Sequence, residues 1–172
     1  MGTRRSHSFV LLFACPLPAC MMLARLALVC LLVTACHKPQ EGYQYAVLDR
    51  DGVDEAVFSF DMDSTVSYST YFCCRYDLGE IDRESVRLFV KVVSPSGYTY
   101  RDTVVFPLYK SRAQAAGDSY TKFDIEQNWN ANIEWIWRSG VSSREAGVWT
   151  VSARPESYKG LHSLGFHYTP SR

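Results

Sequence analysis

The chain has 172 residues, of which 47% are hydrophobic and 14% aromatic, and its 18 basic side chains balance its 18 acidic ones. This length suits one domain with a substantial buried core. Because the basic residues form no cluster, the sequence gives no electrostatic reason to expect a nucleic-acid partner.

The N-terminal segment has the pattern of a bacterial lipoprotein signal. The apolar run Leu26–Ala35 follows Arg25 and holds ten residues, well short of the roughly 20 that a membrane-spanning helix needs. Small residues end this run and Cys36 follows it directly. We therefore predict a lipoprotein signal peptide over residues 1–35, with cleavage before Cys36. The alternative is an ordinary secretory leader that happens to contain a cysteine, and Met21 or Met22 is an alternative start of either leader.

Cys36 is the predicted lipidation site, and the membrane is the first predicted partner. A lipoprotein cysteine carries two or three acyl chains, and several chains hold a protein firmly on a membrane where one chain does not. Residues 36–44 form a polar, lipidated tether, and residues 45–172 form the folded domain. No acidic cluster follows Cys36, which favours the periplasmic face of the outer membrane over the cell surface.

The mature chain offers little material for metal or redox chemistry. Apart from Cys36, only Cys73 and Cys74 remain after cleavage, and they are adjacent. Neighbours on a strand point to opposite faces, so a bridge between them would be strained. We interpret both as small apolar strand residues. His162 and His167 have no partners at metal-ligand spacing, so neither a metal nor a cofactor is predicted.

The folded domain shows the period-2 alternation of β-strands, with turn residues about every ten positions. The expected strands are Tyr43–Leu48, Val57–Asp61, Val66–Tyr76, Val86–Val92, Tyr98–Pro107, Ile133–Arg138, Trp149–Ala153 and Leu164–Tyr168. Parallel strands need long crossovers, and the only helical segment expected is a turn or two within Lys110–Ala116. The prediction is an all-β fold, an antiparallel β-sandwich of about seven to eight strands.

One short segment resembles a catalytic motif. Asp61-Met62-Asp63-Ser64-Thr65 after an apolar strand is similar to the first motif of haloacid-dehalogenase-type phosphatases, in which the first aspartate attacks phosphorus. Asp118, Asp124 and Lys110 could then complete a metal site. That family needs a parallel sheet with helical crossovers, which this sequence does not predict. We therefore favour solvated turn residues, and a protein that is not an enzyme.

Three blocks of the domain resemble the GldH-like gliding-motility lipoproteins of Bacteroidetes. They are the Ser69–Phe72 strand followed by Ser85–Val90, the turn Ser94–Gly97 followed by Arg101–Leu108, and the segment Gly147–Val151 leading to Gly160–Phe166. The chain departs from that family between Lys110 and Asp118 and in the aromatic run Trp129–Trp137. The resemblance implies a β-sandwich envelope lipoprotein that acts through envelope protein partners in gliding or an associated secretion machinery, with no catalytic residues.

Four tryptophans are the remaining candidates for binding. Trp135 and Trp137 share a strand face and are expected in the core. Trp129 stands between two asparagines in a polar turn, which favours an exposed ring able to contact a protein partner or a glycan. A glycan-binding sandwich is therefore the alternative to an envelope protein that works through protein contacts.

Overall fold

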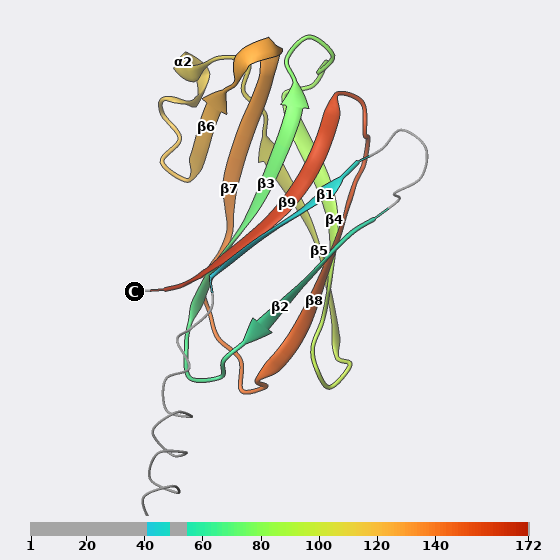
Figure 1. Ribbon diagram of the computed structural model, residues 1–172, viewed down its shortest axis with the longest axis vertical. Coiled ribbons are helices and arrows are strands. Elements are labelled where there is room, and N and C mark those ends of the chain that lie inside the picture. The colour runs from blue at the N-terminus through green and yellow to red at the C-terminus, as the bar shows by residue number, and fades with distance from the viewer. Residues whose placement is uncertain (1–40, 49–54, 172) are drawn as a thin grey trace, which may run out of the picture. The chain divides into compact units, whose positions relative to one another are not determined.

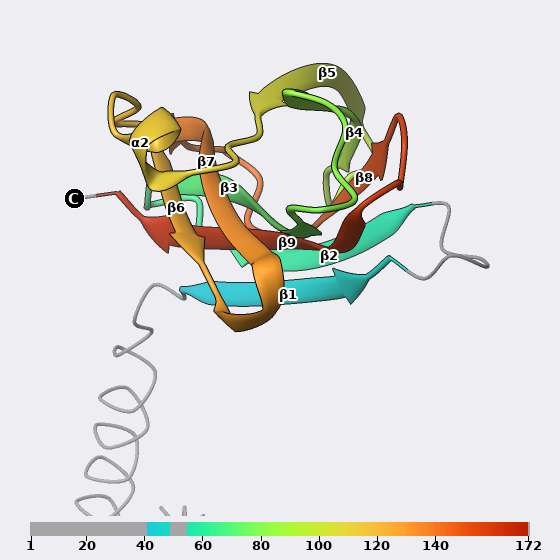
Figure 2. The same cartoon turned by 90° about the horizontal axis from the view of Figure 1, so that it is seen from above.

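The computed structural model describes residues 41–48 and 55–171, which form a sandwich of two antiparallel sheets (Figures 1 and 2). Within these residues there are nine strands, so the predicted fold class is confirmed. The predicted signal peptide and Cys36 lie outside the described residues. No helix in the described part of the chain is long and apolar enough to cross a membrane.

The larger sheet has five strands in the order β1-β9-β3-β7-β6. Their bounds are Gly42–Val47 for β1, Leu161–Pro170 for β9, Tyr68–Asp77 for β3, Asn130–Val141 for β7 and Thr121–Ile125 for β6. The smaller sheet has four strands in the order β2-β8-β4-β5. These are Ala56–Met62 for β2, Gly147–Pro155 for β8, Ser85–Val93 for β4 and Thr99–Pro107 for β5.

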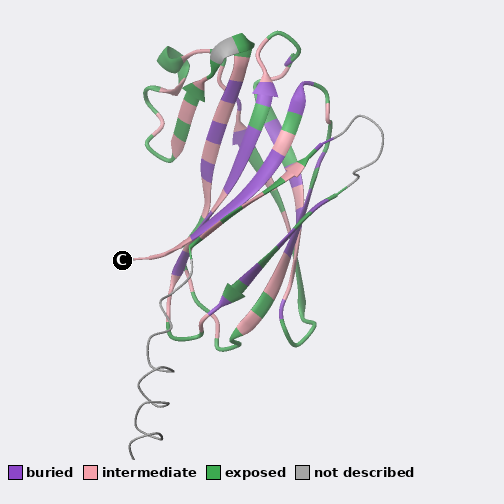
Figure 3. Ribbon diagram, viewed as in Figure 1, coloured by how far each residue is buried: buried purple, intermediate pink, exposed green. Residues whose placement is uncertain are grey.

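Alternation in the sequence decides which side chains enter the core, because successive residues of a strand face opposite sides. Along β3 the inner positions Tyr68, Phe72 and Tyr76 are buried, and Leu88 on β4 and Phe166 on β9 pack with them. Figure 3 shows buried and less buried positions alternating along β3 and β7. Each strand expected from a period-2 pattern is therefore observed, with ends that differ from the expected ones by up to three residues.

Trp135 and Trp137 were both expected in the core, but only Trp135 is fully buried. Trp135 is buried, stacks on Phe106 with ring centroids 4.8 Å apart, and donates from Nε1 to the Pro107 carbonyl at 2.8 Å. Trp137 is only half-buried, although it packs against Phe72 at 5.1 Å. This difference arises because β7 leaves regular pairing near Trp137.

Strand β6 was not expected from the sequence. Its outer positions are charged and it is only five residues long, so no apolar alternation marks it. It is held by pairing with β7 from Thr121↔Trp135 to Ile125↔Ala131. The short helix α2, Arg112–Ala115, precedes it and lies within the predicted helical segment.

Candidate functional site

Trp129, the one tryptophan predicted to be exposed, projects from the turn between β6 and β7. Its side chain is 75% exposed. Asn128 and Trp129 both have positive φ angles, of 73° and 63°. Asparagine tolerates this left-handed conformation, but it costs energy for a bulky residue such as tryptophan. The Trp129 carbonyl accepts from Leu78 N at 2.9 Å, and Glu126 N donates to Asn130 O at 2.8 Å. These bonds fix a turn that holds the indole away from the domain.

The aspartates of the phosphatase-like pattern lie apart. Asp61 is on the outer side of β2 in the four-stranded sheet, whereas Asp118 precedes β6 in the five-stranded sheet. Asp118 accepts from Tyr109 Oη at 2.7 Å and Tyr120 N at 2.9 Å, and Asp124 pairs with Arg112 at 2.6 Å. Asp118 and Asp124 thus each have a local structural partner, and the fold does not bring the motif together.

The two cysteines are unbridged and buried on opposite sides of β3, as the sequence predicted. Burial raises the pKa of each thiol to about 12. Both are therefore neutral at physiological pH, and a neutral thiol is a poor nucleophile. In the described ranges no group of three or more histidine, cysteine, aspartate or glutamate side chains is arranged to hold a metal.

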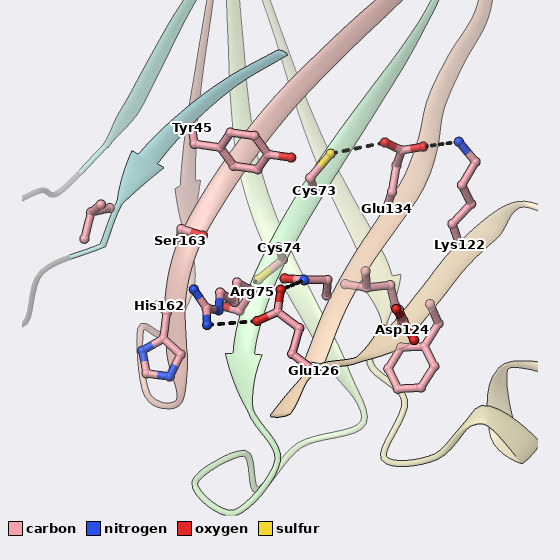
Figure 4. Close-up of a pocket in the computed structure, with 14 residues that line it drawn as sticks. Tyr45, Cys73, Cys74, Arg75, Lys122, Asp124, Glu126, Glu134, His162 and Ser163 are labelled. Carbon is pink, nitrogen blue, oxygen red and sulfur yellow. Dashed lines mark hydrogen bonds and ion pairs between the residues drawn. The ribbon is translucent and has the colours of Figure 1, made fainter. Parts of the chain in front are cut away.

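The outer face of the five-stranded sheet carries a trough of about 670 Å³ (Figure 4). A row of cross-strand neighbours runs through the trough and contains one residue from each strand of the five-stranded sheet. In sheet order these are Tyr45 on β1, Gly165 on β9, Cys73 on β3, Glu134 on β7 and Lys122 on β6. The row results from register, since each residue is the direct cross-strand partner of the next.

Glu134 is the polar centre of this row. It accepts from Lys122 Nζ at 2.8 Å and from Cys73 Sγ at 3.5 Å, and its other contact is His167 Nδ1 at 3.2 Å. Burial alone would raise the pKa of Glu134, but the Lys122 hydrogen bond and nearby positive charge outweigh it, so this pKa lies below its ordinary value. Glu134 is therefore an ionised, partly desolvated carboxylate.

His167 is on the outer face yet only 4% exposed. Tyr43 covers it with ring centroids 3.7 Å apart and planes 12° apart, and Tyr71 stacks at 4.8 Å on the other side. Its second ring nitrogen, Nε2, contacts Glu41 at 3.3 Å. The sequence predicted a satisfied or solvated histidine; the structure places it within a ladder of aromatic rings.

A second polar pair lies beside the central row. Arg75 on β3 pairs with Glu126 at 2.9 Å, and Asn132 on β7 donates to the same glutamate. Tyr45 and Val47 form the β1 wall of the trough. The trough therefore combines a floor of fixed hydrogen-bonding groups with an exposed aromatic wall. Such a surface can bind a ligand or partner that offers both hydroxyl or amide groups and an apolar face.

The sequence did not identify the trough because it depends on register. Alternation places Cys73, Glu134 and His167 on the outer side of their strands. It does not show which strands are neighbours, and β6, which supplies Lys122, was not predicted at all.

No protein-family model matches the sequence, and no curated protein matches it. Among solved structures, one from infectious bursal disease virus (Gt strain) is 11% identical, with a TM-score of 0.19, over 77% of this chain and 40% of that chain. A likeness this low supports no argument about function.

Proposed function

We propose that the protein is a lipid-anchored, non-enzymatic component of the cell envelope that acts through protein contacts. The main support for the proposal is the exposure of large apolar and aromatic side chains on the outer face of β1. Tyr43, Tyr45 and Val47 are 51%, 62% and 72% exposed and occupy successive positions on that face. Tyrosines and aliphatic residues grouped on an exposed face are typical of protein interfaces, where aromatic side chains provide much of the binding energy.

The position of β1 supports the same proposal. Among the described residues it is an edge strand, paired only with β9, and it begins at Gly42, within the segment 36–44 predicted as a tether from Cys36. Gln44, on the opposite side of β1, accepts from Ser59 N at 3.0 Å and donates to the Ser59 carbonyl. This contact ties β1 to β2 and leaves the tyrosine face of the strand turned outward. The resemblance to gliding-motility lipoproteins suggests a partner in a motility or secretion assembly at the periplasmic face of the outer membrane.

A pull-down with matched variants tests this proposal. Val47→Glu places a charge on the β1 face, whereas Val57→Glu makes the same change at a 57% exposed position on the edge strand β2 of the other sheet. Tagged, membrane-extracted protein should recover envelope partners, and Val47→Glu should lose them while Val57→Glu keeps them. Equal recovery by both variants, or no envelope partner with the unchanged protein, would reject the β1 face as the interface.

The second candidate is glycan binding. It is favoured by the trough, in which Tyr45 stands beside fixed polar groups, and by the strained turn that exposes Trp129. Binding measured on a panel of envelope polysaccharides should weaken at least tenfold in Tyr45→Ala or Trp129→Ala. Tyr120→Ala, at a 72% exposed position, is the control. If no polysaccharide binds the unchanged protein, this candidate is rejected.

A further inference from the structure

Strand β1 has one hydrogen-bonded side and one free side. Leu48, just after β1, continues the register with β9 and donates from its N to His162 O at 2.9 Å. In an antiparallel ladder, opposed residues that bond in this way alternate with opposed residues that do not. Counting back from Leu48, every second residue of β1 therefore bonds to β9. The backbone N–H and C=O groups of the others point away from β9, and these residues are Tyr43, Tyr45 and Val47.

The free side of β1 is open in the described part of the chain. No described strand pairs there, and Figure 2 shows β1 at the rim of the sandwich. The same three residues carry the exposed side chains of the β1 face. A line of backbone donors and acceptors thus runs beside an aromatic and aliphatic surface. This combination identifies the occupant, because an extended polypeptide offers N–H and C=O groups at the matching spacing.

The other edge strands of the described fold are protected against strand addition, whereas β1 is not. Natural edge strands avoid pairing with a further chain by being short or by carrying charges or prolines. Strand β6 has five residues and includes Lys122 and Asp124. Strand β5 includes Arg101 and Asp102 and ends at Pro107. Strand β1 has six residues, none of them charged and none of them proline.

The edge of β2 is closed by a side chain. Ser59 N donates to Gln44 Oε1 at 3.0 Å, and Gln44 Nε2 donates to the Ser59 carbonyl. One amide side chain therefore satisfies both edge-facing backbone groups of Ser59. Within the described ranges, no side chain does the same for Tyr43, Tyr45 or Val47.

We propose that β1 binds its envelope partner by strand addition, in which an extended segment of the partner pairs with the free edge and continues the five-stranded sheet. This inference rests on the proposed function and specifies how the β1 face recognises its partner. Backbone hydrogen bonds from Tyr43 to Val47 fix the register of the added strand. Its outward side chains lie beside the β1 face, where aromatic and β-branched residues pair best.

Photocrosslink mapping in living cells tests this pairing on the full-length chain. A benzophenone amino acid replaces Tyr43 in one strain and Val47 in another. Because paired strands have nearly the same rise per residue, strand addition predicts adducts from both strains in one segment of the partner, about four residues apart. Adducts in two segments that are remote in the partner's sequence, or adducts between two copies of this chain, would overturn the proposal.

Proline substitutions separate backbone pairing from side-chain contact. Val47→Pro removes an edge-facing N–H but keeps an apolar side chain, and edge strands tolerate proline. Recovery of the partner from membrane extracts should fall about tenfold, as expected for a lost hydrogen bond at the interface. Val47→Thr keeps the N–H and should recover the partner as the unchanged protein does. Val57→Pro, two residues before Ser59 on the edge of β2, should do the same.

The variants also distinguish failure of this inference from failure of the proposed function. If Val47→Glu abolishes recovery while Val47→Pro leaves it unchanged, the β1 face is the interface but strand addition is rejected. If the unchanged protein recovers no envelope partner, both are rejected. The crosslink map decides the question even if Val47→Pro folds poorly, because it does not depend on that variant.

Discussion

At the scale of single residues, the most informative feature is Trp129. Its backbone adopts a conformation that disfavours tryptophan, and its ring contributes little burial. Strained backbone is concentrated at functional sites, and this supports Trp129 as a candidate contact residue for the proposed function. The sequence correctly placed an exposed aromatic ring here, since flanking asparagines indicate a turn. It could not show the positive φ angles.

The backbone cost at Trp129 predicts that glycine stabilises the domain. Trp129→Gly should raise the free energy of unfolding by up to about 1 kcal/mol, because glycine adopts positive φ without steric penalty. Trp129→Ala retains the penalty and serves as the control, with stability near that of the unchanged protein. Urea unfolding measures both. A clear loss of stability in Trp129→Gly would mean that the indole supports the fold.

The two buried thiols predict a loss of stability at alkaline pH. Their pKa values of about 12 exceed the ordinary value of about 8.5, so the fold favours the neutral form. This contribution is fully present below pH 8.5 and is lost as the pH rises towards 12, because the unfolded chain releases these protons first. Urea unfolding between pH 8.5 and 9.5 should show a decline in the free energy of unfolding. This interval lies below the ordinary pKa range of tyrosine.

The doubly substituted variant Cys73→Ala/Cys74→Ala is the control for this effect. Its baseline stability will be lower because two buried side chains become smaller. Its stability should nevertheless change less with pH over that interval. An equal slope in both proteins would show that other groups cause the alkaline loss.

At the scale of elements, the edge strand β1 depends on a glycine in its neighbour. Gly165 on β9 lies directly beneath the Tyr45 ring, where a Cβ atom would stand 2.7 Å from ring carbons and 3.2 Å from Cys73 Cβ. The missing side chain lets the tyrosine lie flat across β9 and reach the thiol of Cys73. The wall of the trough therefore depends on this one position.

Gly165→Ala should displace Tyr45 and destabilise the domain by about 1 to 3 kcal/mol, the usual cost of overpacking. Gly117→Ala is a matched control, since a Cβ atom at Gly117 would meet nothing within 4 Å. Its stability should stay close to that of the unchanged protein. Chemical denaturation measures the difference, and equal midpoints for the two variants would contradict the packing argument.

The predictability of the elements follows from their burial. Strands with one face in the core, such as β3, β4 and β9, carry alternation strong enough to read from the sequence. Strand β6 lies at the edge of its sheet and has charged residues at its outer positions. Its composition therefore gives no strand signal, and it is recognised only by its pairing with β7. The trough was not predictable for the same reason, because it depends on register.

At the scale of the whole molecule, we propose a β-sandwich that is anchored through its N-terminus and presents an exposed aromatic edge strand. The predicted anchor is the lipid on Cys36. The protein with Cys36→Ala should lose incorporation of labelled palmitate. It should also resist the predicted cleavage that would shorten the unchanged chain to residues 36–172. Metabolic labelling and gel mobility measure the two effects, and retention of label in Cys36→Ala would place the lipid elsewhere.

Photocrosslinking in living cells tests the central claim most directly. A benzophenone amino acid replaces Val47 on the β1 face or, in a matched strain, Val57 on β2. The account predicts a discrete adduct with an envelope protein at position 47, identified by mass spectrometry, and none of that adduct at position 57. Absence of a protein adduct at position 47, or the same adduct from both positions, would contradict a role carried by the β1 face.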